Sequence, residues 1–275
     1  MAITHAKKSV PYLAEFDKII NDIHNFYQQR GHKRIASLRS LAEELDENTQ
    51  TLNYIYAVRW CSSELLAIKK IHKMCFIIQK NLEDISKDFR KFDSKTRETA
   101  NKLLLIFRNK NFISLFHFMI DLLEDLNRYS QIFQESGGLV IGKRLIVNKM
   151  IESIKKLHTS FGSVFNNFLK DIVCEDESCT QCNCDLESYE SHQVFWRNIE
   201  LTDDLNVPKL TSFRKELLDQ LEKEILKYFP DIDLKNFDIF LPEKFPRNQL
   251  QVDLFAGIQL VFSEISGYGK QEIAI

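Results

Sequence analysis

Apolar residues recur every three or four positions along most of this chain, and that spacing predicts amphipathic helices. In the stretch Tyr12–Gln29 they fall on one face, and Gly31 follows where glycine commonly ends a helix. Further helices are expected over Ile35–Leu45 and from Ser62 to Leu82. Between these two, Leu52–Trp60 is richer in β-branched and aromatic residues, which is typical of a short strand or an extended link.

Later in the chain the same periodicity predicts five more helices: Thr96–Phe107, Phe112–Phe133, Leu145–Ile172, Leu210–Phe229 and Leu250–Ser263. The second of these carries apolar residues on more than one stripe, which is typical of a central helix that packs on several sides. Gly137 and Gly138 separate it from the third. Antiparallel pairing of these two helices across the glycines is therefore the simplest arrangement.

Residues 173–206 differ from the rest because they are acidic, rich in cysteine and poor in large apolar side chains. This composition favours a loop or insertion. The chain is thus expected to comprise a helical domain at 1–172, an acidic Cys-containing loop at 173–206 and a C-terminal helical segment at 207–275. The predicted fold class is all-α, an elongated array of helices with at most one or two short strands.

The overall composition, 44% hydrophobic and 28% charged, is that of a folded globular protein and not of a disordered one. No apolar run reaches the roughly 18 residues that a membrane-spanning helix needs. The first sixteen residues lack the apolar core of a signal peptide. We therefore expect an intracellular protein, without a membrane partner, whose cysteines are reduced.

The formal net charge of −2 conceals an uneven distribution along the chain. Residues 1–110 hold 20 lysines and arginines against 13 acidic residues, a net charge of +7, and residues 111–160 hold 6 against 5. The whole chain has 37 lysines and arginines and 39 acidic residues. Residues 161–275 therefore hold 11 basic and 21 acidic residues, a net charge of −10. A basic N-terminal half could face phosphate groups, but an ordinary solvated helical surface explains the same residues, which form no dense block.

Four cysteines lie close together in the acidic segment: Cys174, Cys179, Cys182 and Cys184. Four thiolates can close a tetrahedral zinc site, and the C-x2-C pair has ligand spacing. The one-residue gap before Cys184 is unfavourable, however, and the acidic neighbours would raise the pKa of each thiol. Zinc and a plain acidic loop therefore both remain open, and no other cofactor is expected.

Three histidines, His72, His117 and His158, fall on predicted helices and could face one another in a bundle. A metal or catalytic cluster would need carboxylates or cysteines beside them, and the sequence places none there. They are expected to be interior or boundary residues without a special role.

Four segments resemble hAT-superfamily transposases and their domesticated vertebrate relatives. Arg59-Trp60, followed by SSELLAIKKI, is similar to the start of a long helix in the family's helical insertion domain. Lys110–Gln134 and Leu217–Pro246 resemble later segments of the same family, and Phe16–Leu45 is similar to zinc-finger MYM-type relatives. Together these segments are spread along the chain from Phe16 to Pro246.

The resemblance implies an RNase H-like core in which three carboxylates hold two Mg²⁺ ions. The family's two aspartates lie on strands well before the Arg-Trp pair. Here only 58 residues precede Arg59, and they are predicted to be helical, with Asp17 and Asp22 on one amphipathic helix. Glu264 stands roughly where the family's glutamate is sought. The RNase H-like core is therefore expected to be incomplete and adjacent to residues 207–275, and the protein is expected not to be an enzyme.

The resulting functional expectation is a catalytically inactive, transposase-derived nuclear protein that acts through protein–protein association, with dimerisation as one form. The first alternative is a DNA-binding module, in which the Trp60 indole stacks on a base while Arg59 meets a phosphate. Packing of Trp60 at a helix start is the simpler account of that residue. A scaffold part of a SUMO- or ubiquitin-transfer protein is a further alternative.

Overall fold

The computed structural model describes residues 2–28, 32–55, 60–135, 140–174, 194–197, 199–202, 205 and 207–229. Within these residues the chain is mostly helical. The helices are α1 (Ala2–Ser9), α2 (Pro11–Gln28), α3 (His32–Glu44), α4 (Trp60–Lys73), α5 (Cys75–Lys87), α6 (Ser94–Arg108), α7 (Lys110–Glu135), α8 (Val140–Thr159), α9 (Ser163–Lys170) and α10 (Leu210–Tyr228). The predicted all-α class with a few short strands is therefore confirmed.

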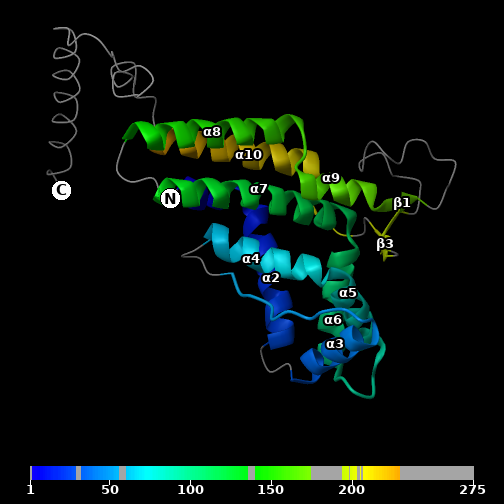
Figure 1. The fold of residues 1–275 in the computed structure, drawn as a ribbon. Helices are drawn as coiled ribbons and strands as arrows, with labels where there is room; N and C mark the ends of the chain where they lie inside the picture. The colour runs from blue at the N-terminus through cyan, green and yellow to red at the C-terminus, as the bar shows by residue number, and fades with distance from the viewer. Residues whose placement is uncertain are drawn as a thin grey trace, which may run out of the picture.

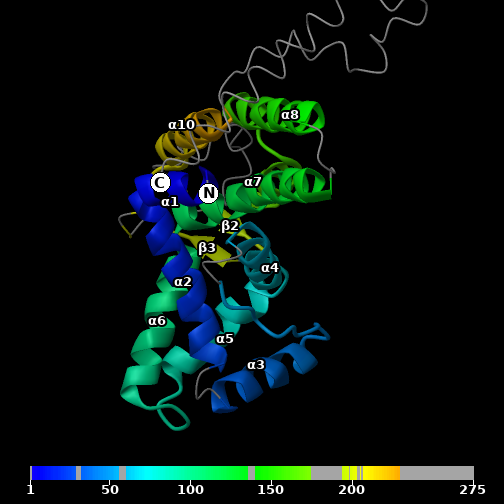
Figure 2. The same ribbon diagram turned by 90° about the vertical axis from the view of Figure 1, so that its left-hand side faces the viewer.

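The helices form two groups that share one continuous core (Figures 1 and 2). Helices α7, α8 and α10 lie side by side in an upper group, with α1 packed against α10. Helices α3, α5 and α6 form a lower group, and α2 and α4 lie between the two. Helix α10 thus packs against both the first helix and α8, although it is remote from α1 in sequence.

Helix α7 is the central element, as its broad apolar surface predicts. Its residues from Phe112 to Leu123 are buried, and among them the Phe112 ring contacts Phe16 of α2 and the Phe116 ring contacts His72 of α4. A helix that is apolar all round gains free energy only when it is covered all round, at about 25 cal/mol for each Å² removed from water. The other helices cover it.

Helices α7 and α8 run antiparallel, as expected. The Ser153 hydroxyl on α8 donates a hydrogen bond to the Asp125 carboxylate on α7. One turn earlier on α7, the Asp121 carboxylate accepts hydrogen bonds from Val164 and Phe165, which follow α8 in the chain. Residue numbers thus decrease along α7 in the direction in which they increase along α8.

Two predicted long helices are interrupted, so both predictions are wrong in this respect. The stretch expected from Ser62 to Leu82 divides at Met74, whose backbone angles (φ −101°, ψ 7°) redirect the chain between α4 and α5. The apolar period continues through this bend, because Ile71, Met74 and Cys75 are all buried. The sequence pattern alone therefore could not reveal the break.

The helix predicted over Leu145–Ile172 ends at Thr159, and α9 begins after Gly162. Asp121 causes the new start: its carboxylate accepts hydrogen bonds from the backbone N–H groups of Val164 (3.0 Å) and Phe165 (2.9 Å). It therefore supplies the N-terminal cap of α9 from a different helix. Burial raises the pKa of Asp121, while these two N–H groups oppose the shift.

Replacement of Gly162 by alanine tests this cap. A Cβ atom there would lie 2.2 Å from Cγ of Asp121, so the carboxylate would have to leave the two N–H groups. We expect the free energy of unfolding to fall by about 1–3 kcal/mol, the usual cost of buried donors without a partner. Urea denaturation followed by circular dichroism measures it. The exposed neighbour Ser163→Ala is the control, and an unchanged Gly162→Ala protein would contradict the assignment.

The prediction of a loop over residues 173–206 is wrong at the ends of that segment. Strands β1 (Ile172–Cys174), β2 (Val194–Trp196) and β3 (Ile199–Leu201) form a small antiparallel sheet in the order β1-β2-β3. Their apolar side chains Val194, Trp196 and Leu201 are buried, and the Trp196 ring contacts His117 of α7 and Phe168 of α9. Strands of three residues are too short to show a clear alternation in sequence.

Candidate binding surfaces

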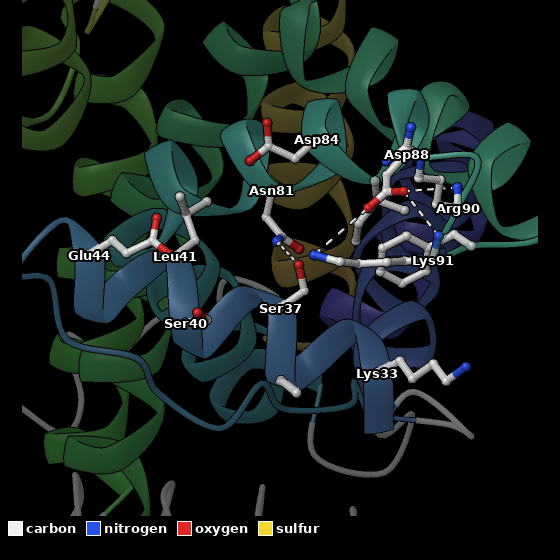
Figure 3. Close-up of a pocket in the computed structure, with 13 residues that line it drawn as sticks. Lys33, Ser37, Ser40, Leu41, Glu44, Asn81, Asp84, Asp88, Arg90 and Lys91 are labelled. Carbon is white, nitrogen blue, oxygen red and sulfur yellow. Dashed lines mark hydrogen bonds and ion pairs between the residues drawn. The ribbon is translucent and has the colours of Figure 1, made fainter.

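A groove of about 800 Å³ lies between α3, α5 and the loop that joins α5 to α6 (Figure 3). Small-molecule and peptide sites commonly have volumes of about 300–1,000 Å³. The groove is lined by Lys33, Ala36, Ser37, Ser40, Leu41, Glu44, Asn81, Asp84, Ile85, Asp88, Arg90, Lys91 and Phe92. Because both charged and apolar side chains line it, this surface can contact a ligand that carries charges and an apolar stem.

The floor of the groove is a fixed chain of hydrogen bonds. The Tyr27 hydroxyl on α2 donates to Oδ1 of Asn81 (3.1 Å), and Nδ2 of Asn81 donates to the Ser37 hydroxyl (2.9 Å). Asn81 and Tyr27 are both buried. The Ser37 hydroxyl is thus an acceptor in this chain, and its own O–H is a donor at the groove surface.

The loop at one end of the groove is held by Asp88. Oδ1 of its carboxylate accepts hydrogen bonds from the backbone N–H groups of Arg90 (2.9 Å) and Lys91 (3.0 Å), and these bonds lower the pKa of Asp88. The Lys91 ammonium lies 3.9 Å from the other carboxylate oxygen and points into the groove (Figure 3). Between these residues, Phe89 is 72% exposed, the largest exposed fraction among the large apolar side chains of the described chain.

Two further carboxylates line the groove. Glu44 is the last residue of α3, and Asp84 faces it from α5. Burial is the main cause that raises the pKa of Asp84, and the neighbouring carboxylates Glu83 and Glu44 raise it further, while Lys80 and Lys87 oppose them. A cationic group bound here would stabilise the ionised form of Asp84.

The histidines form a second cluster, deep in the core. The rings of His72 and His117 meet edge to face with centroids 4.9 Å apart, whereas His158 lies 3.6 Å from Asp219 on α10. His117 also stacks on Phe168 at 4.2 Å and contacts Trp196 at 5.0 Å. His72 and His117 thus face each other, whereas His158, on α8, lies beside α10.

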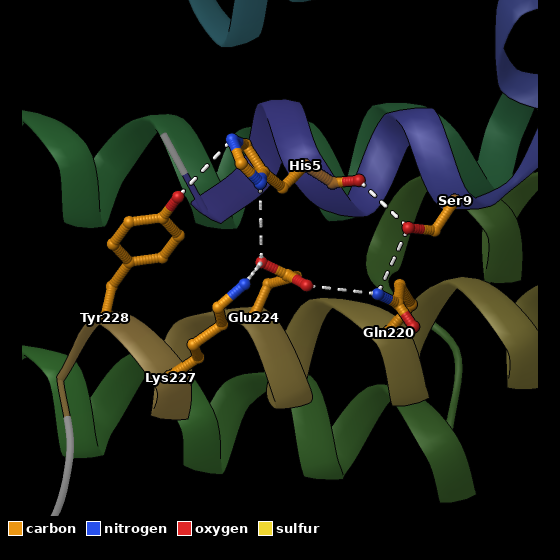
Figure 4. Close-up of polar contacts among 6 residues, drawn as sticks. All are labelled: His5, Ser9, Gln220, Glu224, Lys227 and Tyr228. Atoms are coloured by element: carbon orange, nitrogen blue, oxygen red, sulfur yellow. Dashed lines mark hydrogen bonds and ion pairs between the residues drawn. The ribbon is translucent and has the colours of Figure 1, made fainter.

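A third cluster ties α1 to α10 (Figure 4). His5 lies 3.9 Å from the Glu224 carboxylate and 3.4 Å from the Tyr228 hydroxyl, and Gln220 donates hydrogen bonds to both Ser9 and Glu224. The Glu224 side chain is only 9% exposed, and Lys227 approaches the same carboxylate oxygen at 3.9 Å. These contacts anchor the first helix to the last described one.

An apolar surface lies at the end of the upper group, where α7 and α10 finish and α8 begins. Three exposed apolar side chains lie toward this end, one on each helix: Ile132, Leu145 and Leu226 are 41%, 51% and 38% exposed, and we call this set the apolar end. The antiparallel pairing of Asp125 with Ser153 brings Ile132 and Leu145 to about the same level. Phe133 and Phe229 join α7 to α10 at this level, with ring centroids 5.5 Å apart.

Most of the predicted site residues lie outside the residues that the structure describes. Trp60 is the first residue of α4, but its side chain and the whole of Arg59 lie outside the described residues. Cys174 ends β1, while Cys179, Cys182 and Cys184 lie outside the described residues. DNA binding through the Arg-Trp pair and zinc binding by the cysteines therefore stay predictions, as does the division of the chain at residues 172 and 207.

The sequence did not predict the groove, because its residues come from three separate elements. Lys33, Asn81 and Lys91 share no motif, and their spacing follows from how α3 packs on α5. In the described part of the chain, no group of three or more histidines, cysteines and acids is arranged to hold a metal ion. None of the described helices is long and apolar enough to cross a membrane.

Comparison with known proteins gives no relative. No family model, no curated protein and no solved structure matches the chain. The functional argument therefore rests on the groove, the apolar end and the charges around them.

Proposed function

We propose that this chain is a catalytically inactive, transposase-derived protein that acts by associating with another protein, most simply a second copy of itself. The apolar end carries the proposal. Exposed apolar side chains scattered singly over a surface are ordinary, whereas a cluster of them at one site marks an interaction surface. Three helices contribute to this cluster, so it is a feature of the packed upper group and not of a single amphipathic helix.

The isologous form of such an association is favoured by symmetry. In a two-fold dimer the same patch meets itself, so Leu145 of one copy would pack on Ile132 or Leu226 of the other. Each of these side chains is between about one third and one half exposed and could still lose most of that exposed area. Full burial of an exposed leucine or isoleucine contributes about 1.5–3 kcal/mol, and these side chains would each contribute about half of that, so the expected dimer is weak.

The proposed lack of catalysis is supported by the placement of the N-terminal acids. Asp17 and Asp22 both lie on α2, five residues apart. At 3.6 residues per turn this spacing rotates them by about 140°, so they point to nearly opposite faces. Two carboxylates in this relation cannot share the metal ions that transposase chemistry requires, whose separation is about 3.5–4 Å. Glu264, the third acid considered, lies outside the described residues.

Sedimentation equilibrium over a range of concentrations tests the association. We expect a monomer–dimer equilibrium in the micromolar range, and Leu145→Glu should weaken it at least tenfold because a charge would enter the apolar contact. Phe89→Glu is the matched control, since Phe89 is more exposed but lies in the lower group. A wild-type chain that stays monomeric at 100 µM would refute self-association, and equal weakening by both substitutions would refute the apolar end as the interface.

A further inference from the structure

The three-stranded sheet closes one side of the site that holds His72 and His117. It lies beside α9, at one end of the upper group (Figure 1). The Trp196 ring of β2 meets the His117 ring edge to face at 5.0 Å, and the His117 ring meets the His72 ring in the same way at 4.9 Å. His117 and Trp196 are each 1% exposed. Movement of the sheet away from the helices would therefore open this buried pair to water.

The sheet is a small element with a limited attachment to the helices. Each of its strands has three residues. Apart from the contacts of Trp196, it is tied to the junction of α6 and α7 by Thr202, which follows β3. The Thr202 N–H donates to the Arg108 carbonyl oxygen (2.7 Å), and the Thr202 carbonyl oxygen accepts from the Lys110 N–H (2.8 Å). Such segments can open locally at a lower free energy than the whole fold, so the sheet can leave while α4 and α7 stay folded.

The sheet also carries a charge that opposes its own docking when the histidines are protonated. Arg197 follows β2, and its guanidinium lies 5.1 Å from the centre of the Trp196 ring. Burial is the main cause that lowers the pKa of His72 and His117, and the positive charge of Arg197 lowers both further. Protonation of the pair would place three positive charges in one buried site. Undocking relieves this repulsion, because it removes Arg197 and admits water to both imidazoles.

The other titratable groups around the pair compensate little of this charge. Asp171, which follows α9, raises the pKa of His72, but burial and Arg197 each lower it by more. Asp121, one turn further along α7, is already held by backbone N–H groups of α9. Burial raises the pKa of the Cys75 thiol on α5 to about 12, so the thiol stays neutral.

We propose that the sheet of β1, β2 and β3 is a pH-sensitive cover, which undocks from α7 and α9 when His72 and His117 take up protons and leaves the helices folded. The surface uncovered in this way includes the rings of Trp196 and Phe168, which contact each other in the closed form. Acidification would thus replace a closed face by an apolar one. The inference goes beyond self-association, since the sheet and the apolar end are different surfaces.

The size of the effect follows from the protons that the open form takes up. In the closed form the pKa is about 4 for His72 and about 3 for His117, whereas in the open form both would return to about 6.5. The open form therefore binds more protons between these values, and the equilibrium constant for opening rises as the pH falls. From pH 6 to pH 5 the rise is about sevenfold for each histidine and roughly 50-fold for the pair.

Amide hydrogen exchange of the full chain, followed by NMR, tests the proposal. The Thr202 N–H reports opening of the sheet, and the Ile20 N–H, in the middle of α2, reports unfolding of the whole chain. After correction for intrinsic exchange rates, the opening constant at Thr202 should exceed that at Ile20 at least about tenfold at pH 6. It should change less than about twofold in 1 M urea, because local opening exposes little surface. From pH 6 to pH 5 it should rise roughly 50-fold.

Two histidine variants assign this rise to the buried pair. His117→Phe should reduce it to about sevenfold, since one proton is no longer taken up on opening. His158→Phe is the matched control, because His158 lies on α8 beside Asp219, and it should keep the roughly 50-fold rise. A ratio between two pH values cancels any change in stability that is the same at both.

Two results would overturn the proposal. Equal opening constants at Thr202 and Ile20 would mean that the sheet opens only when the whole chain unfolds. A rise that His117→Phe leaves unchanged would mean that the protons are taken up elsewhere. Neither result depends on dimer formation, so failure of this proposal is distinguishable from failure of the self-association.

Discussion

Acidification from pH 7 to pH 5 is expected to lower the free energy of unfolding by about 4 kcal/mol through His72 and His117 together. Burial is the main cause that lowers the pKa of both histidines, to about 4 for His72 and about 3 for His117. Arg197 lowers both pKa values further. Asp171 opposes the shift of His72, and the hydrogen bond between Nδ1 of His117 and the Ile113 carbonyl oxygen opposes that of His117.

The direction of this effect follows from the pH at which the folded and the unfolded states take up protons. In the unfolded chain both histidines become charged as the pH falls through about 6.5, whereas in the folded chain they stay neutral until about pH 4 and pH 3. The unfolded state therefore binds more protons between these values, and stability decreases as the pH falls. Each histidine contributes a slope of at most about 1.4 kcal/mol per pH unit.

Urea denaturation at a series of pH values measures this slope. His117→Phe should roughly halve the dependence between pH 6 and pH 5, because one of the two protons is no longer taken up on unfolding. Phe168→Leu, which removes a ring stacked on His117 at 4.2 Å, is the control and should lower stability similarly at every pH. If His117→Phe leaves the slope unchanged, the histidine is not neutral in the folded core.

The second large effect is expected from Trp196→Ala, at about 3–5 kcal/mol of lost stability. The Trp196 side chain is 1% exposed, and its ring contacts His117 at 5.0 Å and Phe168 at 5.8 Å. Through Trp196, β2 packs against α7 and α9. Removal of the indole would leave a cavity that helices already in close contact cannot fill.

Denaturation followed by circular dichroism checks this expectation, since the substitution also removes a fluorophore. Trp196→Phe should cost much less than the alanine substitution. The indole N–H of Trp196 has no hydrogen-bond partner among the described residues, so phenylalanine keeps an aromatic contact and removes a buried donor. A loss below about 1 kcal/mol for Trp196→Ala would mean that the sheet does not dock on α7 in solution.

The sequence by itself determined where most helices lie. Apolar periodicity placed α2, α3, α6, α7 and α10 within a few residues of their observed ends, since in each case one face must be buried for the helix to be stable. The same pattern identified α7 as the central helix. Helix α1 was not predicted, because its eight residues show less than three turns of periodicity.

Only the tertiary structure decided where the helices break and which polar residues meet. Asp121 ends one helical run and starts another by capping α9 from α7, and no local pattern near Gly162 reveals that distant carboxylate. The groove likewise depends on Ser37, Asn81 and Lys91, which come from different elements. Burial of a helix face is a local, periodic property that sequence records, whereas capping and charge pairing depend on the relative placement of helices, which only packing fixes.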